Sequence, residues 1–275
     1  MEAERSAGLP RRVPEELRQL LEAAHLERDA IGMSRAAIYR VSGLPQWGTA
    51  YLKVEECTEE DDLLREKQVL EWLRGRLPVP QVLYFDELDG TQFLLISEIA
   101  GLHAAAEEHF VSEAAITAMI RALARGLRQV HALDFRECPF RRDLDVVLAE
   151  AQERVERGLV DSSELERENM GRDPREILQE LQDTRPAAED LVFTHGDYCL
   201  PNIILQGDKI SGFVDWGRGG VADRYTDIAL AVRSLRYNLA GRADLDLIRI
   251  FLGEYGLSPA DEAKIDYYIL LDELS

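Results

Sequence analysis

Two aspartates and one asparagine, Asp197, Asn202 and Asp215, each stand at the end of a short apolar segment. Asp197 and Asn202 lie in HGDYCLPNIIL (195–205), and Asp215 lies in VDWG (214–217). A carboxylate within hydrogen-bond reach of a hydroxyl can take its proton. Carboxylate and amide oxygens are also the hard ligands that Mg²⁺ prefers, and the ion neutralises charge on phosphates. These side chains therefore indicate phosphoryl transfer to an alcohol.

The spacing of His195, Asp197 and Asn202 strengthens this hypothesis. It matches the H-x-D-x-x-x-x-N pattern of a kinase catalytic loop, and Asp215-Trp216-Gly217 stands in the place of D-F-G. The pattern predicts Asp197 as the general base and Asn202 and Asp215 as Mg²⁺ ligands. His195 more often has a structural role at such a position, and a transition-metal site lacks a third ligand of suitable spacing.

A phosphate-binding lysine is expected in the first third of the chain. Lys53 lies in the apolar segment AYLKV (50–54), which corresponds to the V-A-I-K of kinases, and Glu66 follows on a predicted helix as its partner. An edge-strand lysine that favours solubility is the alternative. No glycine-rich phosphate motif is present, so the candidate phosphate loop is GMSRAAIY (32–39), for which an ordinary hairpin turn is the alternative.

The elements that must position these residues differ between the two parts of the chain. Apolar periodicity and turn residues in the first third predict a helix at 14–29, strands at 36–41 and 49–54, a helix at 59–77, and strands at 79–87 and 91–98. The rest is rich in helices, predicted at 112–133, 143–157, 174–183, 222–238, 244–255 and 260–273, with short strands at 191–193, 203–205 and 210–214. The boundary is placed at Ser97–Gly101, and the class is α+β.

Composition restricts the class of protein. The 275 residues are 46% apolar, which suffices for a substantial core. The net charge of −20 disfavours nucleic acid and anionic membranes as partners. No segment has the roughly 20 apolar residues of a membrane span, and the N-terminus does not resemble a signal peptide, so a cytoplasmic location is expected. The three distant cysteines are expected to be reduced thiols.

Several segments together resemble the aminoglycoside 3′-phosphotransferases, antibiotic-resistance enzymes of protein-kinase-like fold. The matching segments are GMS…YR (32–40), YLK (51–53), REK…WLRGRLPVP (65–80), HGDYCLPNI (195–203), GFVDWGRGGVADRYTDIALAVRS (212–234) and YYILLDEL (267–274). The resemblance implies a bilobal fold, with a nucleotide-binding lobe at 1–97 and a catalytic, aminoglycoside-binding lobe at 98–275. It also implies transfer of a γ-phosphate from ATP or GTP, with Mg²⁺, to the 3′-hydroxyl of a kanamycin- or neomycin-type drug.

The same resemblance assigns further site residues. On the nucleotide side these are Tyr51 against the adenine, Ser97 and Ile99 in the hinge, and Met33 and Ser34 over the phosphates. On the drug side they are Arg218, Arg233, Asp272 and Glu273. Aminoglycosides carry several ammonium groups, so carboxylates are their natural complement. That complementarity adds the chain end at Ser275 and Glu166, which lies in the acidic segment SSELERE (162–168). A solvated helix or loop is the alternative for this segment.

Two departures from the family pattern bear on the drug spectrum. Tyr237-Asn238 stands where the family commonly has an acidic pair, and Ser275 replaces a terminal aromatic residue. The alternatives are a kinase of another small alcohol, of the macrolide, choline or homoserine type, and a non-catalytic nucleotide-binding pseudokinase. The chain is expected to be a monomer or a weak dimer.

Overall fold

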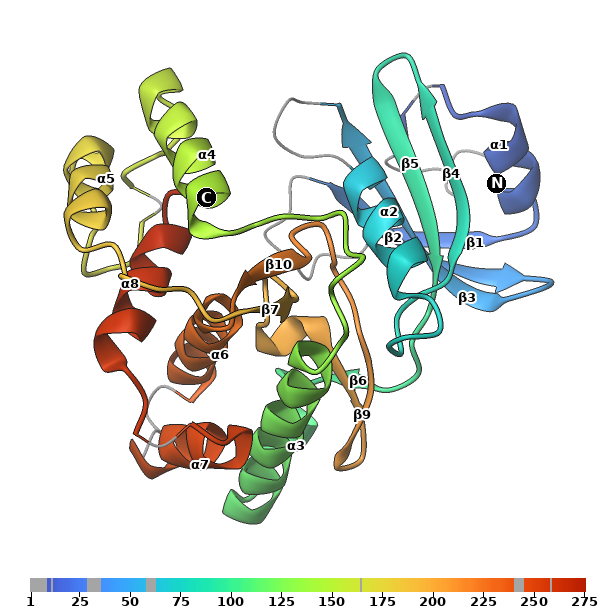
Figure 1. Cartoon of the computed structure of the whole chain (residues 1–275). Helices are drawn as coiled ribbons and strands as arrows, with labels where there is room; N and C mark the ends of the chain where they lie inside the picture. The colour runs from blue at the N-terminus through green and yellow to red at the C-terminus, as the bar shows by residue number, and fades with distance from the viewer. Residues whose placement is uncertain are drawn as a thin grey trace. The chain divides into compact units, whose positions relative to one another are not determined.

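The computed structural model describes residues 9–10, 12–28, 36–57, 63–163, 165–239, 245–257 and 259–275 (Figure 1). The chain folds as two compact units, one of residues 1–100 and 211–217 and the other of residues 101–210 and 218–275. Residues 211–217, which the sequence analysis placed with the C-terminal lobe, thus belong to the first unit. No described helix is long and apolar enough to cross a membrane.

The first unit is built on one antiparallel sheet. Its five strands follow the order β1-β2-β3-β5-β4, with bounds His25–Arg28, Ala37–Leu44, Gly48–Glu56, Thr91–Ser97 and Val82–Leu88 in that order. The central strand β3 places Lys53 opposite Ile38 on one side and Leu94 on the other. Lys53 therefore lies in the middle of the sheet, which does not fit the edge-strand alternative.

Helix α2 (Leu63–Leu73) packs against β4 and β5 and carries the second charged residue of this unit. Val69, Leu70 and Leu73 are buried on its inner face, and Glu66 is buried with them. The helix ends before Gly75, whose φ of +77° is a left-handed conformation that favours glycine. The predicted helix at 59–77 was therefore too long at its C-terminal end.

The N-terminal helix was also predicted too long. Helix α1 covers only Glu15–Leu21, and residues His25–Arg28 form β1, which pairs antiparallel with β2. Helical propensity extends across this stretch, but the sheet offers unpaired backbone groups along β2. Pairing with them satisfies the backbone of β1, and this tertiary interaction overrides the local preference.

The second unit is mostly helical. Its helices are α3 (Glu113–His131), α4 (Leu144–Arg157), α5 (Pro174–Asp183), α6 (Tyr225–Asn238), α7 (Leu245–Tyr255) and α8 (Glu262–Asp272). Side-chain caps explain several starts, because Ser112, Asp143, Asp173 and Asp261 each accept a backbone N–H of the first turn. In the packing, α3 contacts α7 and α6 contacts α8 (Figure 1).

Short strands accompany these helices. A two-stranded sheet pairs β7 (Leu191–Thr194) with β10 (Gly220–Asp223), and a second sheet has the order β6-β8-β9 (Leu102–His103, Ile203–Gln206 and Lys209–Phe213). The prediction of a helix from 222 was wrong at its start, because residues 220–223 pair with β7 and α6 begins at Tyr225. Strand β9 begins in the second unit, and its residues from Ser211 belong to the first.

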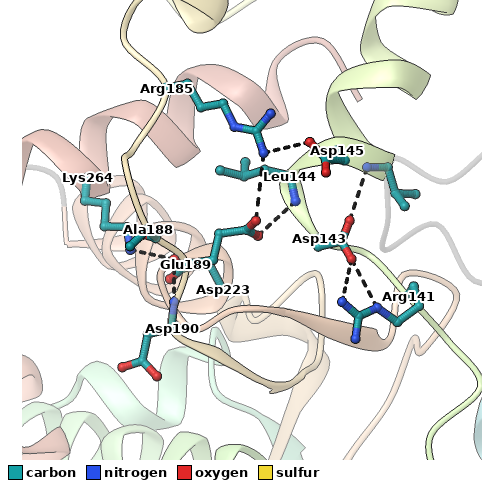
Figure 2. Close-up of polar contacts among 11 residues, drawn as sticks. Arg141, Asp143, Leu144, Asp145, Arg185, Ala188, Glu189, Asp190, Asp223 and Lys264 are labelled. Carbon is teal, nitrogen blue, oxygen red and sulfur yellow. Dashed lines mark hydrogen bonds and ion pairs between the residues drawn. The ribbon is translucent and has the colours of Figure 1, made fainter.

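The link between α5 and β7 is held by polar contacts to α4 (Figure 2). The Arg185 guanidinium lies 2.7 Å from the Asp145 carboxylate, and Glu189 accepts the backbone N–H of Leu144 at 2.9 Å. These contacts fix the path of the chain immediately before β7. Because β7 leads directly into the motif that starts at His195, they also fix where that motif begins.

A second set of contacts joins the same link to α8. Lys264 pairs with the buried carboxylate of Asp223 and donates to the Ala188 carbonyl at 3.1 Å (Figure 2). Asp223 also accepts the backbone N–H of Asp190 at 3.1 Å. Strand β10, the link and α8 are thus held together by one carboxylate and one ammonium.

Candidate active site

The first unit contains a buried group of three charges. The Lys53 ammonium lies 2.8 Å and 2.7 Å from the two Glu66 carboxylate oxygens, and 2.8 Å from Asp215 Oδ1. The predicted pair of Lys53 and Glu66 is therefore present. Lys53 and Glu66 side chains are 10% and 3% exposed, whereas Asp215 is 47% exposed. One carboxylate thus anchors the lysine, and the other faces solvent beside it.

Burial and charge act in opposite directions on this group. Burial alone would lower the pKa of the Lys53 ammonium, but the carboxylates of Asp215 and Glu66 raise it above its usual value. Burial raises the pKa of Glu66, and the ammonium opposes that shift. Lys53 is therefore a cation held between two carboxylates in the middle of a sheet, and an ammonium of this kind can bind a phosphate group.

The backbone around Asp215 is unusual. Asp215 has a φ of +66°, a conformation that few residues other than glycine adopt. The next residue, Trp216, is fully buried, its ring N–H donates to the Phe213 carbonyl at 3.0 Å, and its backbone N–H donates to Glu66. These contacts hold the strained turn. Strain of this kind is concentrated at functional sites in proteins.

The second unit holds the predicted general base. Asp197 is half-buried, and its Oδ2 accepts the Nδ2–H of Asn202 at 2.8 Å. Asn202 donates to the Asp197 carbonyl as well, at 3.0 Å. Buried His195 accepts the backbone N–H of Asp197 through Nδ1 at 3.3 Å. Asn202 and His195 thus both position Asp197, and this contact gives His195 the structural role expected from the sequence.

Asp227 on α6 is a residue that the sequence analysis missed. Its fully buried carboxylate accepts the backbone N–H of His195 at 2.7 Å and of Gly196 at 2.8 Å. Gly196 has a φ of +84°, and a Cβ there would lie 2.2 Å from the Arg218 carbonyl oxygen. A carboxylate within the apolar segment TDIALAV (226–232) was the available signal, because a buried charge needs partners.

Two predicted arginines meet one predicted aspartate in this unit. Asp272 accepts from Arg218 at 2.8 Å and from Arg233 at 2.7 Å. Burial alone would lower the pKa of the Arg233 guanidinium, but Asp272 raises it. The side chain of Asp272 is only 15% exposed. The end of α8 is therefore fixed to α6 and to the segment that follows Gly217.

Glu273 and Glu166 lie beside this group. Glu273 accepts the Asn169 Nδ2–H at 2.6 Å and the backbone N–H of Glu166 at 3.0 Å. The Glu166 carboxylate is 51% exposed and lies 3.9 Å from Arg233. We call Arg218, Arg233, Glu166, Asp272 and Glu273 the arginine–carboxylate cluster. The structure thus brings five predicted drug-side residues together, and Asp272 and Glu273 already bind protein partners.

A hollow adjoins the cluster within the second unit. The space is about 500 Å³ with the adjoining open solvent included, and its lining includes Gly196, Arg218, Asp272 and Ser275. Apolar residues of α4, α6, β10 and α8 form another part of its wall, namely Leu144, Val147, Ala222, Leu230 and Leu271. Half-buried Ser275 therefore lies at the hollow with three residues of the loop and the cluster.

The remaining nucleotide-side residues lie in the first unit. Tyr51 is half-buried on β3, opposite Arg40 and Ile96. Ser97 ends β5, and its hydroxyl accepts the backbone N–H of Gln81 at 2.9 Å. Ile99 is half-buried two residues further on. Met33 and Ser34 lie outside the described residues.

The donor atoms suit a hard cation better than a transition metal. Among the residues that the structure describes, no group of three or more His, Cys, Asp or Glu is placed to hold a metal ion. Mg²⁺ needs only one or two protein carboxylates and keeps several waters. Because Asn202 directs its Nδ2 to Asp197, its carbonyl oxygen is the amide atom that remains for a ligand. Asp215 presents a partly exposed carboxylate.

The family model described as "Phosphotransferase enzyme family" matches residues 25–266, and the chain belongs to this family. Within it, the chain is similar to proteins named aminoglycoside 3′-phosphotransferase. One from Niallia circulans is 42% identical over 263 residues, covering 94% of this chain and 96% of that protein. Another from Enterococcus faecalis is 37% identical and covers 96% and 98%. The resemblance predicted from the motifs is confirmed.

Solved structures confirm the predicted fold class. A crystal structure of an aminoglycoside 3′-phosphotransferase of type VIII superposes with a TM-score of 0.82 at 33% identity, covering 94% of this chain and 97% of that one. An aminoglycoside phosphotransferase from Streptomyces rimosus, in complex with ADP and streptomycin, has a TM-score of 0.79 at 29% identity, covering 94% and 95%. The α+β, kinase-like class is thus correct, and the ADP complex supports nucleotide binding by this fold.

Proposed function

We infer that the chain transfers the γ-phosphate of ATP to the 3′-hydroxyl of an aminoglycoside antibiotic of the kanamycin or neomycin type, and so confers resistance. The names of its relatives support the reaction and the substrate class. An enzyme that consumes ATP to modify such a drug acts where the nucleotide is present, in the cytoplasm.

The observation that carries this proposal is the setting of Asp197. Asn202 fixes its carboxylate at 2.8 Å, and Asp227 holds the two backbone N–H groups that precede it. Arg233 of the arginine–carboxylate cluster is close enough for its charge to interact with Asp197. A fixed, half-buried carboxylate beside a charged surface suits a base that takes a proton from the hydroxyl of a bound cation.

On the nucleotide side, the contacts of Lys53 with Glu66 and Asp215 support its role toward phosphate, and the family resemblance supplies the other roles. Lys53, held by Glu66, neutralises phosphate charge, and Tyr51, Ser97 and Ile99 contact the base of the nucleotide. Asn202 and Asp215 are the residues that would hold Mg²⁺, which would supply further neutralisation of phosphate charge when bound. Excess chelator is expected to abolish turnover, and Asp215→Asn should do the same. Turnover that survives complete metal removal would contradict this assignment.

The decisive experiment measures ATP consumption with and without kanamycin. We expect consumption that depends on kanamycin, and at least about a 10²-fold lower kcat for Asp197→Ala with nucleotide affinity little changed. Asp208→Ala, at an exposed turn residue, is the control and should match the wild type. Consumption that responds to a macrolide, choline or homoserine but not to kanamycin would indicate the alternative kinases. A chain that binds nucleotide without turnover would be a pseudokinase.

The position of transfer is tested with a second drug. Kanamycin has a 3′-hydroxyl, whereas tobramycin lacks it. Kanamycin should therefore accept one phosphate per molecule, and tobramycin none. Stoichiometric transfer to tobramycin would show that another hydroxyl is the acceptor while leaving the phosphotransferase activity itself intact.

A further inference from the structure

A continuous chain of hydrogen bonds runs from helix α7 to the backbone that precedes Asp197. The Tyr255 hydroxyl, on α7, lies 2.8 Å from His131 Nδ1, at the end of α3. The Nε2 atom of the same ring lies 2.9 Å from Asp227 Oδ2. Asp227 in turn accepts the N–H groups of His195 and Gly196 at 2.7 Å and 2.8 Å. Three helices thus contribute to one buried path that ends at the catalytic loop.

Donor and acceptor rules assign the protons along this path. The carboxylate of Asp227 only accepts, so His131 Nε2 must donate to it. Arg224 only donates, and its Nη1 lies 3.2 Å from the Tyr255 oxygen. The Tyr255 hydroxyl, which both donates and accepts, therefore joins the Arg224 guanidinium to His131 Nδ1.

The hydrogen-bonded path is buried where it meets the loop at His195 and becomes more exposed at Arg224. Asp227 is fully buried, the His131 side chain is 4% exposed, and Tyr255 is buried. Arg224 lies nearer the surface, where it pairs with the exposed carboxylate of Asp190 at 2.7 Å. Hydrogen bonds in a buried network constrain geometry strongly, because a lost partner leaves a polar group that water cannot reach.

We propose that Tyr255 is a positioning residue for the phosphoryl transfer. It fixes the orientation of the His131 ring, the imidazole orients the Asp227 carboxylate, and Asp227 sets the backbone that aims Asp197. The inference rests on the proposed function, because the aim of Asp197 matters only if Asp197 is the base. A small displacement of a base from its productive position costs rate without weakening ground-state binding.

Tyr255→Phe removes only the hydroxyl and is the direct test. We expect kcat to fall about 3- to 10-fold, the scale of one hydrogen bond, with both KM values unchanged. In a His131→Phe background the same change should lower kcat no further, because Tyr255 acts through that ring. The control is Tyr225→Phe, which removes a buried tyrosine hydroxyl that accepts the backbone N–H of Asp261 at 3.2 Å. It should leave kcat unchanged.

A second measurement does not depend on turnover. In ¹H–¹⁵N spectra, Tyr255→Phe should shift the amide signals of His195 and Gly196, and Tyr225→Phe should leave them in place. The proposal would be overturned if Tyr255→Phe and Tyr225→Phe had the same kcat, whether unchanged or equally reduced. It would also be overturned if the His195 and Gly196 amide signals did not shift in Tyr255→Phe. A wild type that consumes no ATP with kanamycin would refute the proposed function instead, and the amide shifts would still decide whether Tyr255 positions the loop.

Discussion

Each of the two units contains a group of oppositely charged side chains, and the two groups differ in solvent exposure. Lys53 and Glu66 in the first unit are nearly inaccessible, and one ammonium stands between two carboxylates. The arginine–carboxylate cluster of the second unit is more open, with Glu166 about half exposed and Asp272 between two guanidinium groups. Both groups have one more carboxylate than cation, but the first contains a single ammonium and the second contains two guanidinium groups.

This difference implies two kinds of function for ion pairs. A buried pair is costly to break, because the partner left behind is an uncompensated charge in a medium of low dielectric constant. A partly exposed pair contributes less to stability than a buried one, and salt screens it. The first group should therefore determine whether the protein folds and turns over. The second should determine how tightly a cationic drug binds. The predictions below test that division, from the largest effect to the smallest.

The largest effect is expected for Lys53→Met. The variant leaves buried Glu66 facing Asp215 without a cation, and the free energy of unfolding should fall by about 3–5 kcal/mol. Urea denaturation measures this loss. The control is Lys67→Met on α2, the helix that carries Glu66. It breaks a 3.0 Å pair with Glu71 one turn away and should cost less than about 1 kcal/mol. If the two variants lose the same free energy of unfolding, the buried group of Lys53 does not stabilise the fold more than an exposed pair does.

A smaller effect, confined to binding, is expected for Asp272→Asn. Without this carboxylate, Arg218 and Arg233 present unbalanced positive charge to a cationic drug, so the aminoglycoside KM should rise about 10-fold at unchanged kcat and nucleotide KM. Asp266→Asn, on the same helix, is the control. Asp266 is 71% exposed and lies 3.9 Å from Arg236. Steady-state kinetics measure this change. An equal aminoglycoside KM in Asp272→Asn and Asp266→Asn would show that the cluster does not contribute to drug binding.

Salt should separate the two groups further. Because the screening length falls from about 10 Å at 0.1 M to about 3 Å at 1 M ionic strength, the KM ratio of Asp272→Asn to wild type should decrease toward one. The stability loss of Lys53→Met should persist, since salt does not enter a buried site. Both are measured by repeating the kinetics and the urea curves across a salt series. A salt-independent KM ratio would mean that the cluster acts through its shape and not through its charge.

The smallest effect concerns pH and Glu273. Burial raises the pKa of this carboxyl, against the hydrogen bonds from Asn169 and Glu166 that lower it. The folded state therefore holds the proton more tightly than the unfolded state. The associated stability is present at low pH and is lost as the pH rises through the window just above 4.5. Relative to Glu273→Gln, the wild type should lose less than about 3 °C of Tm across that window.

The control for this titration is Glu168→Gln, at an exposed position of the same loop region. The same pH series on this variant is the reference. If the Tm difference between Glu273→Gln and the wild type varies with pH no more than that of Glu168→Gln, then Glu273 has no altered affinity for its proton.

The sequence analysis succeeded where a pattern is local and failed where partners are distant. The Lys53–Glu66 pair follows from a strand and the next helix, thirteen residues apart, and was predicted. The third member, Asp215, is 162 residues from Lys53, and no periodicity links them. For the same reason, the attachment of residues 211–217 to the first unit was not foreseen. Strand β1 was predicted as helix, because only its partner β2 reveals the pairing.

Asp227 and Asp272 illustrate the same limit at the site. A motif identifies Asp197 because the chemistry requires it at a set distance from Asn202. It does not identify Asp227, which acts by accepting backbone N–H groups that every sequence possesses. Asp272, Glu273 and the two arginines were predicted by resemblance to a family, and their mutual contacts were not. Asp272 and Glu273 prove to bind arginines, an asparagine and a backbone amide, in addition to any ligand.

Residues 211–217 belong to the first unit although they come late in the sequence, and this has a consequence for biosynthesis. The first hundred residues leave the ribosome well before these seven, so the N-terminal sheet emerges without the segment that supplies Asp215 and Trp216 to Lys53 and Glu66. An N-terminal domain usually folds as a unit during synthesis. Here the first unit is complete only when Asp215 contacts Lys53, which is 162 residues away in the sequence. Contacts of such long sequence separation slow folding. A nascent chain arrested before residue 211 should therefore lack part of its first unit. That unit should be sensitive to protease and accessible to chaperones until residues 211–217 have been translated.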